Sequence, residues 1–110
     1  MSYVPERGEA VWLQFNPQAG HEQSGHRPAI VLSPLAYNQR VGLALFCPIT
    51  TQVKRYPFEV TIPVGLAVSG VILADQVKIL DWQARSASLS CRLPDEIVEE
   101  VLQKLLTLIR

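Results

Sequence analysis

Several features are scarce in this sequence of 110 residues, and each scarcity excludes a class of protein. Acidic and basic side chains balance to a formal net charge of zero, so no global field draws the chain toward nucleic acid or a membrane. Two cysteines, Cys47 and Cys91, are too few for a disulfide scaffold and lack metal-site spacing. We expect both thiols to be reduced and buried, since each stands among apolar neighbours.

Long apolar segments are also absent. A membrane-spanning helix needs about 20 apolar residues. The longest apolar stretch, residues 62–74, is shorter and contains Pro63 and two glycines. The first ten residues show no apolar core of a secretory signal, which predicts a cytoplasmic protein without a membrane partner.

The composition is that of a packed globular protein, with 48% hydrophobic and 18% charged residues. We expect a single domain over residues 1–110, because neither repeats nor a linker interrupt the chain. Residues 94–110 contain four acidic and two basic side chains, so the remaining chain carries a net charge of +2. A local patch for a polyanion is therefore possible.

Short apolar runs of strand-forming residues dominate the chain before residue 94. The run 29–32 has no polar interruption, which is typical of a strand covered on both faces. Residues 34–40 are compatible with one helical turn. The predicted strands are 9–15, 27–33, 41–49, 56–62, 71–80 with a bend near Asp75, and a short one within 84–93.

After Pro94 the apolar period changes to that of an amphipathic helix. Its apolar positions are Ile97, Val98, Val101, Leu102, Leu105, Leu106 and Ile109. Short strands separated by Gly and Pro turns favour a small barrel or curled sheet over βαβ units. We therefore predict a mainly β fold whose open face or edge is covered by the C-terminal helix.

The segment "EQSGHRP" places charged side chains at the entrance of a buried strand. Glu22, His26 and Arg27 surround a Ser-Gly pair that lets the chain turn. A guanidinium offers a planar fork of donors that fits two phosphate oxygens, and Pro28 restrains Arg27 to an extended backbone. The alternative is an arginine whose stem packs while its charged end is solvated.

The segment "PITTQVKRY", residues 48–56, collects polar side chains where a strand becomes a loop. Hydroxyls, an amide and cations there form a candidate second contact for a polyanion, with Tyr37, Tyr56 or Phe58 available to stack on bases. A turn with solvated charges is the alternative. The candidate side chains are Thr50, Thr51, Gln52, Lys54 and Arg55.

Metal binding has little support in the sequence. His21 and His26 flank Glu22, but they are the only two histidines, and no HEXXH motif or cysteine pair supplies further ligands. A histidine beside an arginine and a glutamate indicates an acid–base neighbourhood instead. Nucleotide-binding loops and a G-x-S-x-G motif are also missing.

The blocks "ERGEAVWLQFNPQAGHEQSGHRPAIVLSPLAYN", "CPITTQVKRYPFEV" and "VILADQVKILDWQAR" together resemble the MazF/PemK family of toxin endoribonucleases, from about Glu6 to Arg85. The resemblance implies an SH3-like barrel of about five to seven strands, related to that of CcdB toxins. It also implies a homodimer that cleaves single-stranded RNA without a metal or other cofactor. A MazE-like antitoxin partner would place its disordered acidic tail in the RNA groove.

The resemblance also assigns residues. The family's catalytic arginine and threonine match Arg27 and Thr50, and its histidine before the arginine matches His26. The loop residues Glu22 and Gln23 match a family glutamate and glutamine, and Gln76 matches the glutamine of a later strand. Together with Thr51, Gln52, Lys54 and Arg55 from the loop, these residues constitute the predicted site.

A metal-free route to RNA cleavage is attack of the ribose 2′-OH on its own phosphorus, which gives a 2′,3′-cyclic phosphate and a 5′-OH. Arg27 suits the stabilisation of charge on the phosphorane, because a guanidinium stays protonated. Glu22 or His26 would then be the titrating group. The rival interpretation is a CcdB-type gyrase poison, but this chain ends in "LLTLIR" without an aromatic tail and retains Arg27 and Thr50.

Overall fold

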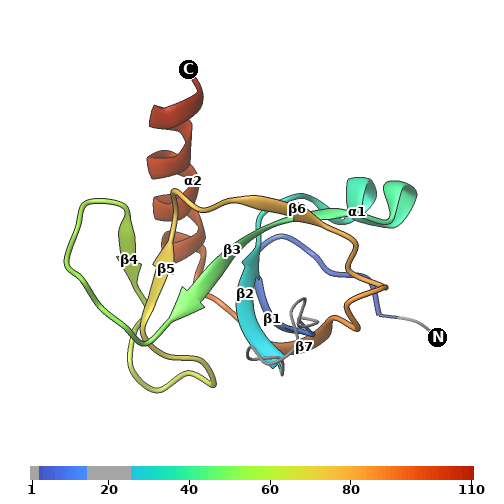
Figure 1. Ribbon diagram of the computed structural model, residues 1–110, viewed down its shortest axis with the longest axis horizontal. Helices are drawn as coiled ribbons and strands as arrows, with labels where there is room; N and C mark the ends of the chain where they lie inside the picture. The colour runs from blue at the N-terminus through green and yellow to red at the C-terminus, as the bar shows by residue number, and fades with distance from the viewer. Residues whose placement is uncertain (1–2, 15–25) are drawn as a thin grey trace, which may run out of the picture.

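An antiparallel sheet and two helices form the regular part of the structure, a computed structural model that describes residues 3–14 and 26–110 (Figure 1). The mainly β fold with a C-terminal helix is confirmed. The described elements are β1 (Glu9–Gln14), β2 (His26–Val31), α1 (Leu35–Val41), β3 (Ala44–Thr50), β4 (Glu59–Thr61), β5 (Val71–Leu73), β6 (Lys78–Leu80), β7 (Ser88–Arg92) and α2 (Asp95–Ile109).

The sheet has the strand order β4-β5-β3-β2-β1-β7, with β6 as a further partner of β3. It curls strongly, so that β1, β2 and β7 wrap around one end of the molecule (Figure 1). The predicted barrel is thus an open, curled sheet in which β4 and β7 are the end strands. All of these pairings are antiparallel.

The predicted bent strand over residues 71–80 is two strands separated by a turn. β5 pairs with the end of β3 and β6 pairs with its beginning, so both occupy the same side of β3. The turn at residues 74–75 is closed by the backbone N–H of Gln76, which donates to the carbonyl of Leu73 at 3.1 Å. This interruption projects Asp75 and Gln76 from the sheet edge.

The predicted helical turn at residues 34–40 is the seven-residue helix α1. It ends at Gly42, whose φ of 82° is left-handed and whose N–H donates to the carbonyl of Asn38 at 3.0 Å. A glycine suits this position because other residues rarely adopt the left-handed conformation.

Apolar side chains of β1, β2 and β3 are buried on both faces of the sheet. Ala29 and Val31 pack with Phe46 and Trp82 on one face, whereas Ile30 and Leu32 belong to the cluster that includes residues of α2. The prediction for residues 29–32 is therefore confirmed. Alternation along β2 divides the run between two clusters.

The first half of α2 covers the cluster that contains Ile30 and Leu32. Ile97, Val98 and Val101 are buried, and the Lys104 ammonium donates to the carbonyls of Pro57 and Glu59 at 2.7 and 3.1 Å. Ile109 at the other end is 67% exposed, because α2 continues beyond the sheet (Figure 1). Neither described helix is long and apolar enough to cross a membrane.

The two cysteines differ in their surroundings. Both are free; Cys47 is fully buried, as predicted, and burial raises the pKa of its thiol to about 12. Cys91 is only partly buried, so the prediction of two buried thiols is wrong for this residue. The reason is its position on β7, an end strand with one open side.

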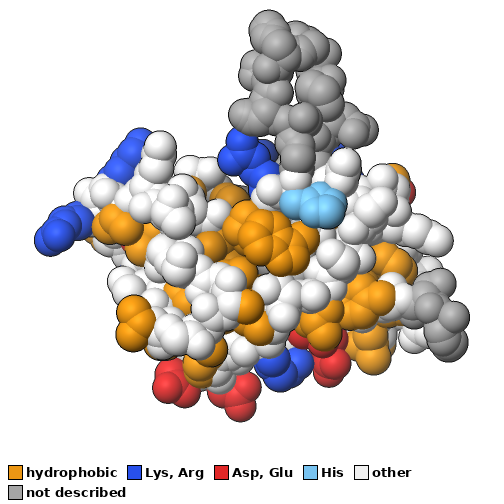
Figure 2. Space-filling model, turned by 90° about the horizontal axis from the view of Figure 1, so that it is seen from below, with side chains coloured by type: hydrophobic (Ala, Val, Ile, Leu, Met, Phe, Trp, Pro, Cys, Tyr) orange, Lys and Arg blue, Asp and Glu red, His pale blue; other side chains and the backbone are white. Residues whose placement is uncertain are grey.

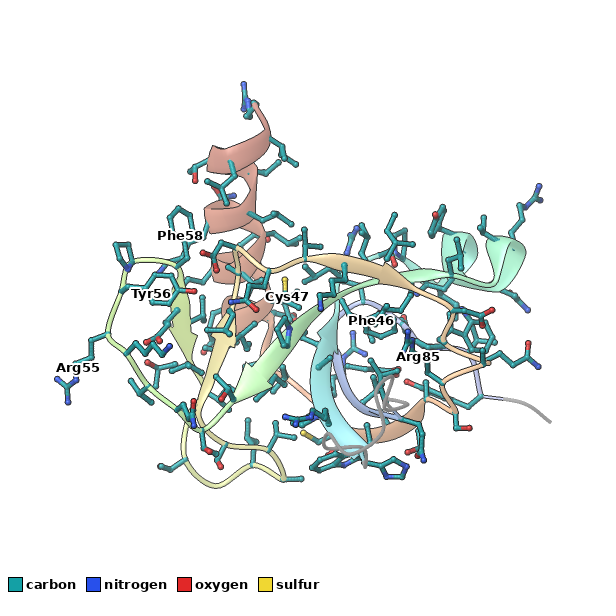
Figure 3. All side chains as sticks on the ribbon, viewed as in Figure 1. Phe46, Cys47, Arg55, Tyr56, Phe58 and Arg85 are labelled. Atoms are coloured by element: carbon teal, nitrogen blue, oxygen red, sulfur yellow. The ribbon has the colours of Figure 1, made fainter. Side chains whose placement is uncertain are left out.

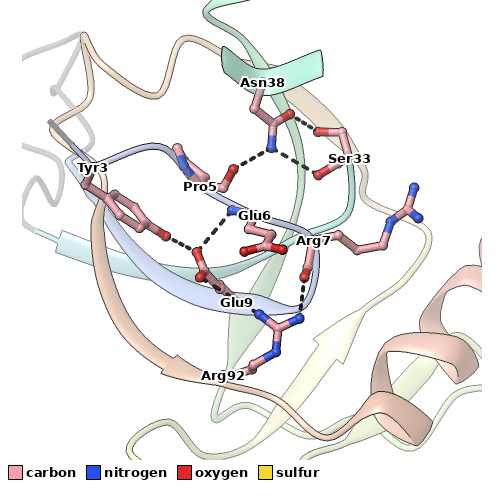
Figure 4. Close-up of polar contacts among 8 residues, drawn as sticks. All are labelled: Tyr3, Pro5, Glu6, Arg7, Glu9, Ser33, Asn38 and Arg92. Carbon is pink, nitrogen blue, oxygen red and sulfur yellow. Dashed lines mark hydrogen bonds and ion pairs between the residues drawn. The ribbon is translucent and has the colours of Figure 1, made fainter. Parts of the chain in front are cut away.

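A buried polar cluster fastens the N-terminal segment to the sheet (Figure 4). The Asn38 side chain donates to the carbonyls of Pro5 and Ser33 at 2.8 and 3.0 Å and accepts from the Ser33 hydroxyl. That hydroxyl in turn accepts from the backbone N–H of Leu45 at 2.8 Å. We call Pro5, Ser33, Asn38 and Leu45 the Asn38 cluster. Each of its buried side-chain polar atoms has a partner.

Candidate active site

Arg27 and Thr50, which are distant in sequence, line one cavity of about 160 Å³. Arg27 is the second residue of β2 and Thr50 is the last residue of β3. Ala29 pairs with Pro48, and continuing this antiparallel register by two residues brings Arg27 level with Thr50. Cβ atoms of residues directly opposite in such a pair are about 5 Å apart. The strand register therefore positions both side chains.

A third segment completes this cavity, which we call the Arg27 cavity. Gln76 enters from the turn after β5, and Lys78 from the first position of β6, opposite Phe46. Lys78 was not among the predicted site residues. A lysine in the apolar run "VKIL" was its only sequence signal, since the pairing of β6 with β3 is not visible in the sequence. Arg27 and Lys78 are the charged side chains of its lining.

The Thr50 hydroxyl is oriented by a local hydrogen bond. Its Oγ accepts from the backbone N–H of Gln52 at 3.1 Å, which leaves the hydroxyl proton available to donate. Thr50 is half-buried, so the hydroxyl is held at the cavity wall rather than on a mobile surface chain. This geometry suits a donor to a phosphoryl oxygen.

Gly70 supports Thr50 from the neighbouring segment. Its φ is +106°, and a Cβ built there would lie 2.1 Å from the carbonyl oxygen of Thr50. In the sequence Gly70 is only a glycine between two predicted strands. The structure adds that a side chain at residue 70 would displace the backbone carrying Thr50.

The loop after β3 divides its predicted contacts into two groups. Gln52 and Lys54 line a second cavity of about 330 Å³, which shares Thr50 and Gln76 with the Arg27 cavity. Thr51 and Arg55 are exposed and belong to neither lining. Arg55 extends away from the body of the molecule, whereas Tyr56 points inward (Figure 3).

The Glu59 carboxylate holds this loop in place. It accepts from the backbone N–H groups of Lys54 and Arg55 at 2.8 and 2.9 Å. Arg55 has a φ of 62°, a left-handed conformation that is costly for a residue with a side chain. The two hydrogen bonds to Glu59 hold the backbone of Lys54 and Arg55 in this conformation.

The predicted site residue His26 lies outside the Arg27 cavity. His26 is exposed and adjoins Arg27 on β2, so alternation directs the two side chains to opposite faces. Glu22 and Gln23 lie outside the described residues.

Charge is separated locally although the chain is neutral. Figure 2 shows a hydrophobic patch between mainly basic side chains on one side and mainly acidic ones on the other. This pattern agrees with a local patch for a polyanion. Over residues 3–14 and 26–110, no group of three or more His, Cys, Asp or Glu side chains could hold a metal ion.

Comparison with known proteins identifies the relatives of the chain. The family model described as a PemK-like, MazF-like toxin of a type II toxin–antitoxin system matches residues 6–109. The endoribonuclease toxin MazF of Escherichia coli K12 is 47% identical over 97% of this chain and 96% of its own. The endoribonuclease toxin ChpB of the same strain is 44% identical over 91% of this chain and 90% of its own.

A solved structure agrees with this result. The MazE–MazF crystal structure (Form-II) from Deinococcus radiodurans superimposes with a TM-score of 0.94 at 54% sequence identity. It covers 98% of this chain, and 97% of the relative is covered in return. The family match, the sequence identities and the structural superposition agree, and the chain belongs to the PemK-like, MazF-like family of type II toxin–antitoxin toxins.

Proposed function

We propose that this protein is the toxin of a type II toxin–antitoxin system and cleaves single-stranded RNA at short sequences without a metal. The relatives with 47% and 44% identity are named endoribonuclease toxins, which supports the same class of activity here. The observation that carries the proposal is the convergence of Arg27, Thr50 and Gln76 from three segments on one cavity.

In the proposed reaction the 2′-OH attacks the adjacent phosphorus, and the bond from phosphorus to the 5′ oxygen breaks. Arg27 and the Thr50 hydroxyl donate to the non-bridging oxygens, whose negative charge increases in the transition state. Lys78 adds a second positive charge to the same cavity. The leaving 5′ oxygen takes up a proton from solvent, so the products are a 2′,3′-cyclic phosphate and a 5′-OH.

A titrating group must remove the proton of the 2′-OH, and Glu22 and His26 are the candidates from the sequence. The strand alternation that turns His26 away from Arg27 argues against the histidine. We therefore assign the base to Glu22. Arg27 remains a charge clamp because a guanidinium group stays protonated in proteins.

The same family relationship supports the partners. We propose a homodimer, and a MazE-like antitoxin as the inhibitor, because the Deinococcus relative is a MazE–MazF pair. The proposed substrate of this protein, messenger RNA, makes the cytoplasm the expected site of action. The relatives favour this function over a CcdB-type gyrase poison.

The test is an RNA oligonucleotide with one deoxyribose 5′ of the scissile phosphate. We expect unmodified RNA to yield a cyclic phosphate in EDTA, and the deoxy substrate to bind but resist cleavage, because the nucleophile is absent while the phosphates remain. Normal cutting of the deoxy substrate would exclude the cyclic-phosphate route. A requirement for one divalent ion would contradict the metal-free mechanism.

A further inference from the structure

The second cavity differs from the Arg27 cavity in the charge of its walls. We call it the Asp75 pocket; its lining includes Thr50, Gln52, Lys54, Tyr56, Asp75 and Gln76, together with Glu59. Two carboxylates face one ammonium here, whereas the Arg27 cavity has two cations and no carboxylate. A phosphate is therefore attracted to the Arg27 cavity and repelled by the Asp75 pocket.

The hydrogen bonds of the Asp75 pocket leave one acceptor open. The Tyr56 hydroxyl donates to Oδ1 of Asp75 at 2.7 Å, which raises the pKa of Tyr56. No described residue donates to Oδ2 of Asp75. Both carboxylate oxygens of Glu59 already accept backbone N–H groups. Oδ2 of Asp75 is thus the carboxylate oxygen of this lining that accepts from no described residue.

We propose that the Asp75 pocket binds a nucleobase next to the scissile phosphate and selects one that carries an exocyclic amino group. This inference rests on the proposed ribonuclease function. The two cavities share Thr50 and Gln76, so a base in one adjoins a phosphate in the other. A volume of about 330 Å³ falls at the small end of ligand pockets, about 300–1,000 Å³.

The chemistry of the walls explains the selection. A carboxylate only accepts hydrogen bonds, so Asp75 favours the amino groups of adenine, cytosine or guanine. Uracil has no amino group, and its single N–H lies between two carbonyls. One of these carbonyls would face the second carboxylate oxygen, and two acceptors cannot form a hydrogen bond. The Gln76 amide offers a donor and an acceptor to the rest of the base edge, and Tyr56 offers a ring for stacking.

The experiment compares cleavage of a long RNA by the wild-type protein, Asp75→Asn, and the control Glu96→Gln. Glu96 is an exposed acid on α2 that lines neither cavity, so its variant matches the charge change alone. Mapped 5′ ends give the base preference at each position around the cut. For the wild type we expect uracil to be excluded at one position beside the scissile bond.

Asn at residue 75 can donate as well as accept, so Asp75→Asn should gain cleavage of sequences with uracil at that position. Its kcat/KM on the preferred sequence should fall about 5- to 150-fold, as is typical for one lost base contact. Glu96→Gln should keep the wild-type preference.

Two outcomes would overturn the inference, and they are distinguishable. If Asp75→Asn cuts RNA with the wild-type preference at every position, the pocket does not select a base, while the ribonuclease function stands. If the wild-type protein does not cleave RNA, the proposed function fails and the inference with it. Melting curves of Asp75→Asn, an exposed residue, check that the variant is folded.

Discussion

Two groups of polar side chains lie at opposite ends of the β2–β3 pair. They differ in burial and in whether their hydrogen bonds are made within the protein. In the Asn38 cluster, where β2 ends and β3 begins, Asn38 and Ser33 are buried and bond to one another and to the backbone. At the other end, Arg27 is exposed and Thr50 half-buried beside a cavity. No described residue accepts a hydrogen bond from Arg27.

The difference shows how to separate structural from functional polar residues. A buried amide must satisfy its donors internally, because an unpaired buried group costs about 1–3 kcal/mol. Donors left open at a cavity gain nothing for the fold and are available to a ligand. Substitutions at the cavity end should therefore lower the rate of cleavage, and substitutions in the Asn38 cluster should lower the free energy of unfolding.

The largest expected effect is at the cavity end. Arg27→Ala should lower kcat by roughly two orders of magnitude or more, because a donor to the charged transition state is lost. Arg27→Lys should recover little, since an ammonium cannot make the two-pronged contact. Single-turnover cleavage measures the chemical rate, and thermal melting measures the stability of each variant. A large fall in melting temperature with Arg27→Ala would instead make Arg27 a structural residue.

Gly70→Ala should lower both stability and catalytic rate, because it forces the backbone of Thr50 to move. We expect a lower melting temperature and roughly a tenfold lower kcat, by displacement of a positioned donor. Gly65→Ala is the matched control, since Gly65 has a similar φ of +101° but no atom within 4 Å of a built Cβ. Equal activity of the two variants would refute the positioning role of Gly70.

Asn38→Ala should change stability alone. The substitution removes the donors to two carbonyls and leaves a void, so the free energy of unfolding should fall by about 2–4 kcal/mol. Below its melting temperature the variant should cleave RNA at the wild-type rate. Chemical denaturation and cleavage assays at a permissive temperature check this pair of results. A variant that stays folded but loses activity would break the contrast between the two ends.

The smallest effect concerns the thiols. At pH 8 iodoacetamide should alkylate Cys91 in the native protein and Cys47 only after unfolding, because burial blocks access to Cys47 and raises its pKa. The raised pKa also means that the folded state binds the thiol proton more tightly than the unfolded state. The free energy of unfolding should therefore fall as the pH rises from about 9 to about 12, and less so in Cys47→Ala. Fast alkylation of native Cys47 would contradict its burial.

The fold class was accessible from the sequence because its signals are local. The alternation in β1 and the helical period after Pro94 depend on neighbouring residues alone, and both elements formed as predicted. The bent strand over residues 71–80 was different. Its division into β5 and β6 depends on β3, which pairs with both.

The site divides in the same way. Motif resemblance in the sequence singled out Arg27, Thr50 and Gln76, because residue type and order along the chain were enough. Lys78, Gly70 and the acceptor on Asp75 acquired meaning only in the tertiary structure. The register of β3 with β2, β5 and β6 sets these neighbours, and register arises from contacts between residues distant in the chain. The sequence thus determined the fold class and singled out the proposed site side chains, whereas strand pairing decided which groups surround them.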